Sequence, residues 1–226
     1  MSSAAPAFRT RLRFSKKGGL KFVGHLDFLR AFGETVMRSG LPAAFSCGFN
    51  PHILLSFALP LPLGFESEND YADLALMEDV GAEEVAGRLN MAAPAGLFVK
   101  SAGPARDKCA AAVAAADYLG PAAGATAAAA RQALAGPIVV QKKTKSGLRA
   151  ADIRDDIMSA EVSGGEVLLR LRAGSGRFLG PLLAMEGLFG ARPGPVGFCR
   201  LEMHRLENGR AVPLAVPPAV PPGGAP

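Results

Sequence analysis

The spacing of hydrophobic residues predicts alternating strands and helices over the first half of the chain. Residues 8–14 alternate between apolar side chains and arginines, which predicts a strand. Residues 25–39 carry apolar side chains at helical spacing up to Gly40, which predicts an amphipathic helix. Further strands are expected at 41–45, 71–77 and 97–101, an extended apolar run at 53–59 and a helix at 82–91. The resulting order, β-α-β-β-α-β, is that of a ferredoxin-like module.

The second half of the chain shows a similar pattern. We expect strands at 109–118, 138–144, 166–172 and 196–206, helices at 122–135 and 177–189, and a helical insertion at 149–159. The sequence therefore predicts an α+β fold of two tandem ferredoxin-like modules with antiparallel sheets. Their expected ranges are 1–104 and 105–208, and the Pro-rich and Gly-rich segment 209–226 is expected to be a disordered tail.

Composition and charge are compatible with a globular protein that has a polyanionic partner. The 226 residues are 49% hydrophobic and 20% charged, enough for one large or two small domains. The formal net charge is +5 and the pI is near 9.4, which favours a polyanion such as RNA without requiring one. No run approaches the ~20 apolar residues of a membrane span, and the first residues lack a signal-peptide pattern. We therefore expect a cytoplasmic protein with no membrane partner.

The cysteines indicate which cofactors to expect. Cys47, Cys109 and Cys199 are far apart and form no CxxC motif. Their odd number and spacing argue against a disulfide framework and against a zinc or iron–sulfur site built by this chain alone. We expect reduced thiols and no metal or cofactor of its own.

Polar residues concentrate in the segment from residue 24 to residue 64. His25 and Asp27 lie in the first turn of the predicted helix, and Ser46, Asn50 and His52 lie in the turn after the predicted strand 41–45. In a right-handed βαβ unit, the start of the helix and the exit of the second strand lie at the same end of the sheet. We therefore expect the two groups to converge beside a helix N-terminus, which favours anions.

Each of these residues also has a purely structural interpretation. Asp27 complements a helix dipole, His25 belongs to a cap region, and Asn50 precedes a proline in a routine turn. As a converging set, His25, Asp27 and His52 are candidate catalytic residues, and Ser46 and Asn50 are candidate substrate- or anion-binding residues. Their spacing matches no known pattern of metal ligands. Cys47 with a histidine base has the groups for thiol catalysis, without evidence that its thiol is activated.

Two basic stretches are candidate anion-binding sites. The first lies at the predicted edge with the polar cluster and consists of Lys16, Lys17, Lys21 and Arg30. The second lies in 141–156, where Lys142, Lys143, Lys145 and Arg149 form either a solvated hairpin before a salt-bridged helix or a strip that contacts a phosphate backbone. The arginine face of strand 8–14 is a weaker candidate, because the aromatic pairs that stack bases on such sheets are absent.

Four segments carry a family resemblance: KGGLKFVGHLDFLR, RSGLPAAFSCGFNPH, FALPLPLGFES and KTKSGLRAADIRDDI. With these segments the chain resembles the radical-SAM-linked protein family over nearly its whole length, apart from the tail. Members of that family are encoded beside, or fused to, radical SAM enzymes that often carry a cobalamin-binding domain.

The resemblance implies that the chain works with a radical SAM enzyme. The iron–sulfur cluster, S-adenosylmethionine and cobalamin would belong to that partner, because the three-cysteine motif of radical SAM enzymes is missing here. Our leading hypothesis is an accessory module, rather than an enzyme, that presents RNA (tRNA or a ribosomal component) for modification. The alternatives are a stand-alone nuclease or hydrolase that uses His25 and His52 as acid and base, and a protein-docking subunit.

Overall fold

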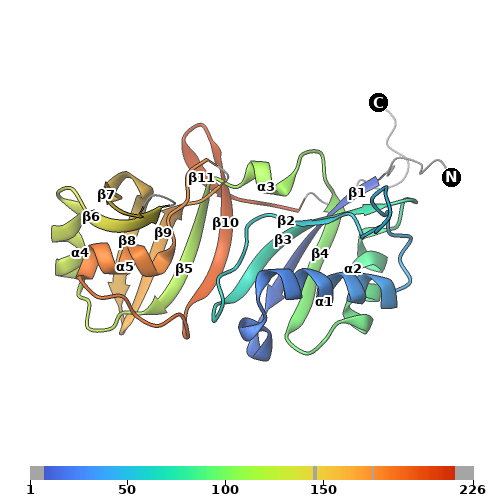
Figure 1. The fold of residues 1–226 in the computed structure, drawn as a ribbon, viewed down its shortest axis with the longest axis horizontal. Coiled ribbons are helices and arrows are strands. Elements are labelled where there is room, and N and C mark those ends of the chain that lie inside the picture. The colour runs from blue at the N-terminus through green and yellow to red at the C-terminus, as the bar shows by residue number, and fades with distance from the viewer. Residues whose placement is uncertain (1–7, 145–146, 175, 217–226) are drawn as a thin grey trace. The chain divides into compact units, whose positions relative to one another are not determined.

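The computed structural model describes residues 8–144, 147–174 and 176–216, and it has a mixed α+β architecture with antiparallel strand pairing (Figure 1). The expectation of an α+β fold with antiparallel sheets is confirmed. The chain divides into two compact units, Met1–Ala112 together with Leu214–Pro226, and Val113–Pro213. The division thus falls after Ala112 rather than after residue 104, because a short helix follows the last strand of the first unit.

The first unit holds a four-stranded antiparallel sheet with the order β4-β1-β3-β2. Its elements are β1 (Phe8–Lys16), η1 (Gly18–Phe22), α1 (His25–Arg38), β2 (Leu55–Phe57), β3 (Glu66–Leu76), α2 (Ala82–Ala92), β4 (Leu97–Pro104) and α3 (Cys109–Ala112). Apolar residues of α1 and α2 pack into one core with those of β1, β3 and β4. The aromatic centre of this core is Phe14, whose ring contacts Phe28, Phe32 and Phe57 at centroid distances of 5.2–6.1 Å.

The strand expected at 41–45 is wrong. Ala43 and Phe45 form isolated bridges, with Leu76 and Ile53 respectively. The chain then turns back on itself over 46–52, since Leu54 donates its backbone N–H to the carbonyl of Ala44 at 2.8 Å. The second strand of the unit is therefore β2, which begins after this turn rather than before it.

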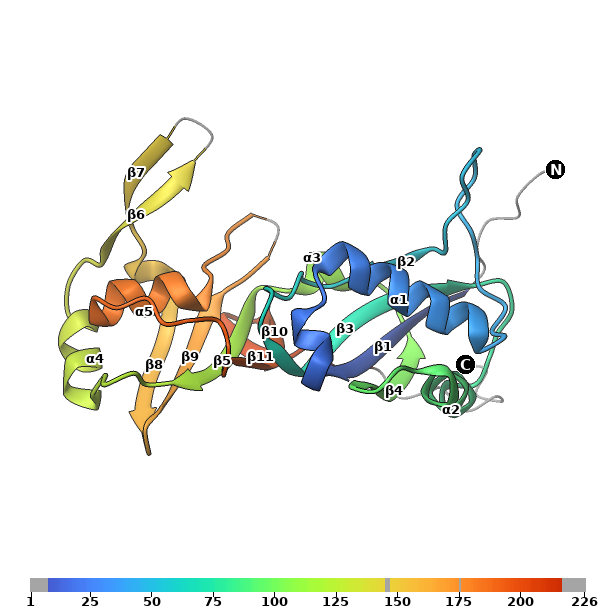
Figure 2. The ribbon, with the colours of Figure 1, turned by 60° about the horizontal axis from the view of Figure 1, so that its bottom comes forward.

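The second unit holds a five-stranded antiparallel sheet with the order β11-β10-β5-β9-β8, and a separate two-stranded sheet of β6 and β7. Its elements are β5 (Ala115–Pro121), α4 (Ala127–Leu134), β6 (Val139–Thr144), β7 (Gly147–Asp152), η2 (Arg154–Asp156), β8 (Ile157–Ser163), β9 (Glu166–Arg172), α5 (Pro181–Phe189), β10 (Cys199–Glu207) and β11 (Arg210–Pro213). Figure 2 shows the β6–β7 hairpin extending away from the rest of its unit.

The helical insertion expected at 149–159 is wrong, because these residues belong to β7, η2 and the start of β8. Helical spacing of apolar residues is hard to distinguish from strand alternation over so short a stretch. Contacts at the base of the hairpin explain why these residues form a strand rather than a helix. The Asp152 carboxylate accepts the backbone N–H groups of Ile138 and Arg154, both at 2.9 Å, and thereby joins the two strands where they leave the unit.

The tail expected at 209–226 begins later than predicted. Arg210–Pro213 form β11, which pairs with β10. The two strands are joined by Asn208 and Gly209, both at positive φ (50° and 77°), as a two-residue hairpin requires. The Asn-Gly pair is a strong indication of a hairpin, but the Pro-rich composition of the segment favoured the prediction of a tail. Residues 217–226 lie outside the described part of the chain.

Candidate functional site

The His-Leu-Asp motif lies in the first turn of α1. His25 is the first residue of the helix, is half-buried, and has its ring 5.7 Å from that of Phe57 in an edge-to-face arrangement. Asp27 is exposed and pairs with Arg30 one turn later at 2.7 Å. The two residues therefore differ: His25 packs against the core, and Asp27 and Arg30 form a surface pair that neutralises both charges.

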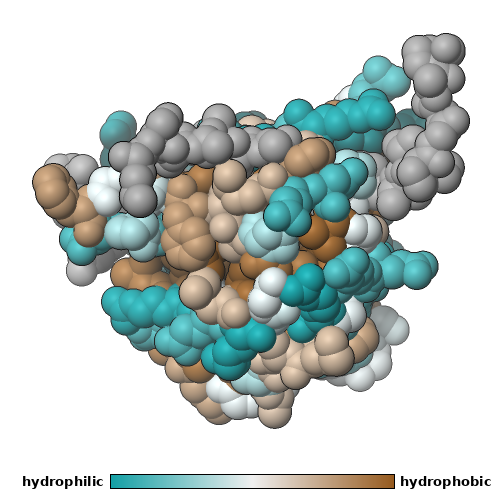
Figure 3. Space-filling view, turned by 90° about the vertical axis from the view of Figure 1, so that its right-hand side faces the viewer, coloured by the Kyte–Doolittle hydropathy of each residue, from teal (hydrophilic) through white to brown (hydrophobic). Residues whose placement is uncertain are grey.

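The second motif, Phe45–His52, is a turn closed by two of its own residues. The Ser46 hydroxyl lies 2.8 Å from Nδ1 of His52 and accepts the His52 backbone N–H at 3.1 Å, and the Ser46 N–H donates to the His52 carbonyl at 2.8 Å. Phe49, at the tip of the turn, is fully exposed at 105%. Figure 3, which faces the outer end of this unit, shows hydrophobic residues forming a band between hydrophilic ones.

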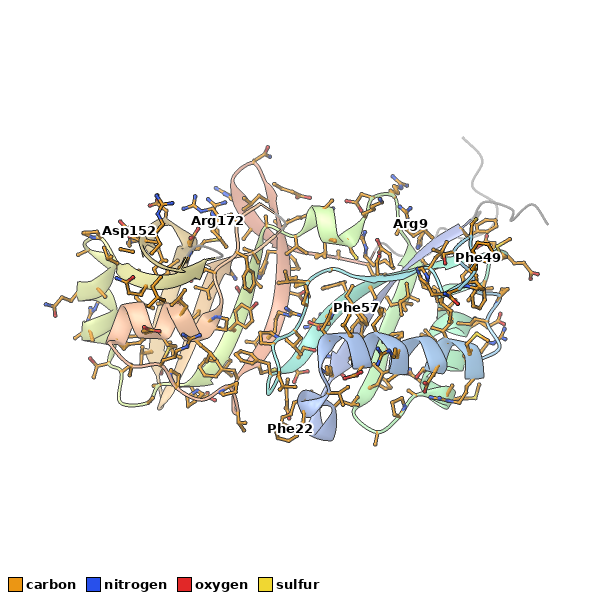
Figure 4. The ribbon with its side chains drawn as sticks, in the orientation of Figure 1. Arg9, Phe22, Phe49, Phe57, Asp152 and Arg172 are labelled. Atoms are coloured by element: carbon orange, nitrogen blue, oxygen red, sulfur yellow. The ribbon has the colours of Figure 1, made fainter. Side chains whose placement is uncertain are left out.

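The expected convergence of the two motifs is wrong. In Figure 4, Phe49 lies at the end of the unit where α1 ends, whereas Phe22, just before α1, lies at the other end. The reason is the position of the second strand. The turn 46–52 precedes β2 instead of following a strand at 41–45, so it lies at the opposite end of the sheet from the start of α1. His25 and His52 thus belong to different places and cannot act as one acid–base pair.

The basic residues upstream of α1 are engaged in ion pairs or buried. Lys21 pairs with Glu66 at 3.1 Å, and Lys17 pairs with Glu68, which also pairs with Lys100. The hydrogen bond from Lys17, opposed by burial and helped by the hydrogen bond from Lys100, lowers the pKa of the Glu68 carboxyl. This edge is therefore a set of paired charges rather than an excess of positive charge.

Lys16 is buried at 1% exposure and lies in the core beneath the start of α1. Its Nζ donates to the Val23 carbonyl at 2.9 Å and lies 4.6 Å from the centroid of the Phe28 ring. Lys16, His25 and the buried Asp70 line a cavity of about 10 Å³, room for about one water molecule. The three titratable groups do share one place, but the space between them is too small for a substrate.

The three arginines of β1 differ in exposure: Arg9 is exposed, Arg13 is partly buried and Arg11 is buried. Arg11 is buried at 3% and pairs with Asp73 at 2.9 Å and with Asp107 at 3.0 Å. Burial by itself would lower the pKa of Arg11, but the hydrogen bonds and charges of Asp73 and then Asp107 raise it overall. Arg13 donates to the Asn69 side chain at 2.9 Å. The central arginine of the predicted nucleic-acid surface is thus part of a buried ion-pair network and is not available to a ligand.

Cys109 belongs to the same network, and its chemistry leads to a prediction. Its backbone N–H donates to Asp73 at 2.7 Å, and burial, followed by the nearby Asp73 charge, raises the pKa of its thiol to about 12. Because the thiolate is the reactive form, we expect Cys109 to resist a thiol reagent at pH 8 in the folded chain. Cys47 is exposed and should react first. Mass spectrometry after brief labelling, with Cys47→Ser as the control, checks this; early labelling of Cys109 would contradict it.

Sequence reasoning missed a charged group inside the second unit. Arg170 donates to both carboxylate oxygens of Asp117 at 2.7 and 2.8 Å, and the His204 ring lies 3.0 Å from the same carboxylate. Burial would raise the pKa of Asp117, but the hydrogen bonds from Arg170 and His204 lower it overall. The sequence did hold one indication of this group, because Asp117 is a charged residue within the apolar strand AADYL.

The second basic stretch forms the exposed β6–β7 hairpin. At the base of the hairpin the buried Val140 packs against Gly187 of α5. A Cβ at position 187 would lie only 3.0 Å from the Val140 side chain, so glycine is needed for this close packing. Beyond the base, Lys142 on β6 lies directly opposite Arg149 on β7 in the strand register. Arg149 and its neighbour Leu148 are exposed. The Lys143 side chain and all of Lys145 lie outside the described residues.

Cations outnumber acids on the hairpin. Between residues 139 and 152 the sequence has four basic residues (Lys142, Lys143, Lys145 and Arg149) and one acidic residue, Asp152. Backbone hydrogen bonds from Arg154 and Ile138 hold the Asp152 carboxylate at the base and lower its pKa. The hairpin is therefore the best candidate site for a polyanion on this chain.

The described residues contain no group of three or more His, Cys, Asp or Glu side chains placed to hold a metal ion. Within the same residues, no helix has the length and apolar character needed to cross a membrane.

Comparison with known proteins identifies a family. No curated protein matches the chain in sequence. A solved chain in "Crystal Structure of a Cbf5-Nop10-Gar1 Complex" is 12% identical, with 86% of this chain and 49% of that chain covered and a TM-score of 0.41. The chain thus spans about half the length of that chain, and a TM-score of this size supports no conclusion about fold or function. A family model matches residues 9–181, most of the chain. The chain therefore belongs to the bacterial family described as "Uncharacterized protein conserved in bacteria (DUF2344)".

Proposed function

We propose that the chain binds RNA through the β6–β7 hairpin and serves as the recognition module of a radical SAM enzyme that modifies this RNA. The observation that carries the first part is the hairpin itself, an exposed two-stranded ribbon with four basic residues and one acid. Cations on such a ribbon bind a phosphate backbone through charge and release of counterions, with little dependence on sequence.

The radical SAM part of the proposal rests on the sequence motifs. The motif KTKSGLRAADIRDDI (residues 143–157) covers the end of β6, all of β7 and η2, so the resemblance includes most of the proposed contact surface. The iron–sulfur cluster, S-adenosylmethionine and cobalamin would be held by the partner enzyme, and this chain would hold the RNA. We place this work in the cytoplasm.

We further propose that each unit is a ferredoxin-like module. In the first unit the sheet order is β4-β1-β3-β2, and in the second the corresponding order is β10-β5-β9-β8, with helices after the first and third strands of each set. The hairpin β6–β7 then lies where the second unit inserts residues between its first helix and its second strand. It is an addition to the module rather than part of its sheet.

The proposal predicts a large loss of RNA binding when the hairpin is neutralised. Alanine at Lys142, Lys143, Lys145 and Arg149 should weaken binding of a fluorescent single-stranded RNA by about 100-fold at low salt. The slope of log K against log salt should become shallower by about 3, because each lost phosphate contact on a single strand contributes about 0.7. Fluorescence anisotropy at several salt concentrations measures both.

The matched control removes four positive charges from the first unit, with alanine at Lys17, Lys21, Arg30 and Lys100. These side chains are already paired with carboxylates, so we expect a much smaller loss. Equal losses in the two variants would show that only net charge matters. Absence of binding by the unmodified chain at every salt concentration would reject the RNA proposal. To test the partner role, the radical SAM enzyme is assayed on the RNA with and without the chain.

A protein-docking subunit is the second candidate, because of Phe49. A fully exposed phenylalanine at the tip of a turn closed by Ser46 and His52 is typical of an anchor for a partner's apolar pocket. This role predicts that Phe49→Ala weakens complex formation with the radical SAM enzyme and leaves RNA binding unchanged.

A further inference from the structure

Asp156 is a buried carboxylate at the foot of the β6–β7 hairpin. It is 5% exposed, lies at the end of η2, and forms an ion pair with Nε of Arg177. Nζ of Lys142, from β6, lies 3.9 Å from its other oxygen. A buried carboxylate is stable only when cations lie close to it. Asp156 therefore holds two cations in place, one from the hairpin and one from the segment before α5.

Arg149 lies on the same face of the hairpin as Lys142. The two residues are directly opposite each other in the antiparallel pairing of β6 and β7, so their side chains point to the same side. Like charges in this position repel and destabilise a hairpin. Within the described part of the chain, no hydrogen bond or ion pair joins the Arg149 side chain to another residue. Placing Lys142 opposite Arg149 therefore lowers the stability of the hairpin unless an anion binds between the two cations.

Arg172, labelled in Figure 4, is a further cation and lies at the end of β9. Its neighbour Leu171 pairs with Ile157, so in the same register Arg172 lies on β9 at the level of Asp156. The Arg172 Nε is buried and has no hydrogen-bond partner among the described residues. A buried N–H without an acceptor is costly.

From this geometry we infer that Lys142, Arg149, Arg172 and Arg177 form a binding site for a phosphodiester group of a nucleic acid, organised by the Asp156 carboxylate. The inference rests on the proposed RNA function and deepens it. Lys142 and Arg177 lie beside the Asp156 carboxylate, Arg149 lies opposite Lys142 on the hairpin, and Arg172 lies at the level of Asp156 on β9. Four cations and one carboxylate leave an excess of positive charge that one phosphate anion only partly neutralises. Guanidinium groups bind phosphate oxygens with paired, directional hydrogen bonds. The site therefore contacts the backbone and does not read the bases.

A change at Asp156 tests the organising role by the sign of its effect. Asp156→Asn removes a negative charge, so a surface that acts only through net charge would bind RNA more tightly. Because Asp156 positions Lys142 and Arg177, the site instead predicts binding about 10-fold weaker. The matched control is Asp155→Asn, which removes the same charge from the exposed neighbour and should leave binding unchanged or slightly tighter. The probe is a fluorescent 12-residue oligouridylate, measured by anisotropy on the full chain.

A second variant keeps the test valid if Asp156→Asn unfolds. Arg149 is exposed, so Arg149→Ala should leave the fold intact, which circular dichroism checks. It should weaken oligouridylate binding about 5-fold and make the salt slope shallower by about 0.7. The control is Arg131→Ala on α4, an equal change of charge in the same unit, with no effect expected.

The outcomes separate the two proposals. If the unmodified chain binds oligouridylate but Asp156→Asn and Asp155→Asn tighten binding equally, or if Arg149→Ala has no more effect than Arg131→Ala, the phosphate site is wrong and the RNA function stands. If polyglutamate of equal charge competes as well as oligouridylate, the ligand class is wrong. If the unmodified chain binds no RNA, the proposed function fails as well.

Discussion

Replacing Asp73 with alanine should lower the unfolding free energy of the first unit by about 3–5 kcal/mol. The carboxylate is 4% exposed, pairs with the buried Arg11 at 2.9 Å and accepts the Cys109 backbone N–H at 2.7 Å. Its removal leaves a buried guanidinium with only the half-exposed Asp107 as a partner, and a buried N–H without an acceptor. Both are costly in a low-dielectric interior. Urea denaturation followed by circular dichroism measures the loss.

The control for Asp73→Ala is an exposed ion pair in the same unit. Asp27→Ala breaks the pair with Arg30, in which both side chains are mostly exposed, and should cost less than about 1 kcal/mol. The Cys109 thiol provides a second readout, because the network that covers it opens in Asp73→Ala and the thiol should label faster. A loss similar to that of Asp27→Ala would mean that the buried network does not hold the first unit together.

Replacing Phe14 with alanine should cost a similar amount, about 3–5 kcal/mol, for a different reason. Phe14 is completely buried, and its ring meets those of Phe28, Phe32 and Phe57. Alanine removes the transfer free energy of the ring and leaves a cavity among side chains of β1, α1 and β2 that cannot all move in. The same urea titration measures the change, and Phe14→Leu, which fills most of the space, should recover a large part of it.

Phe49→Ala is the matched control for Phe14→Ala. The substitution is the same, but Phe49 is fully exposed and buries nothing in the folded chain. We expect a change within about 0.5 kcal/mol. A loss comparable to that of Phe14→Ala would show that Phe49 packs in the folded chain, and would remove the reason to consider it an anchor for a partner protein.

Local sequence patterns predicted the elements whose periodicity is long and clear. The helix expected at 25–39 is α1 and the helix expected at 82–91 is α2, each within about one residue at its ends. The strand expected at 8–14 is the first part of β1, which continues to Lys16. Within these elements Phe14, Phe32 and Leu89 enter the core, so local preference and tertiary packing agree there. Leu26 and Met37 of α1 also follow the helical spacing, yet both are exposed, so the predicted apolar stripe is wider than the face that packs.

The predicted convergence of His25 and His52 is wrong because one strand was predicted in the wrong place. Leu41 to Phe45 has the residues of a strand, but Pro42 lacks an N–H and the following turn brings Leu54 back onto Ala44. With β2 placed after the turn, His52 moves to the other end of the sheet from His25. Strand order decides which loops meet at one end of a sheet, so a shift of one short strand places two loops at opposite ends.

The basic stretch at 141–156 was recognised from its charges alone, but its interpretation depended on the fold. A helix would have placed its arginines and aspartates one turn apart, where they neutralise one another. The hairpin instead places Lys142 opposite Arg149 and removes Asp152 to the base. The same residues therefore form a neutral surface in one structure and an excess of positive charge in the other.

The sequence by itself determined the α+β class, the main helices and strands of the first unit and the charge of the hairpin, because these follow from short-range periodicity and composition. Only the tertiary structure decided which charged residues meet. Lys142, Asp156 and Arg177 have no local pattern in common, and they meet because the base of the hairpin lies beside η2 and Arg177 reaches the Asp156 carboxylate. Contacts between segments that are distant in sequence are set by packing and strand register, which no local pattern encodes.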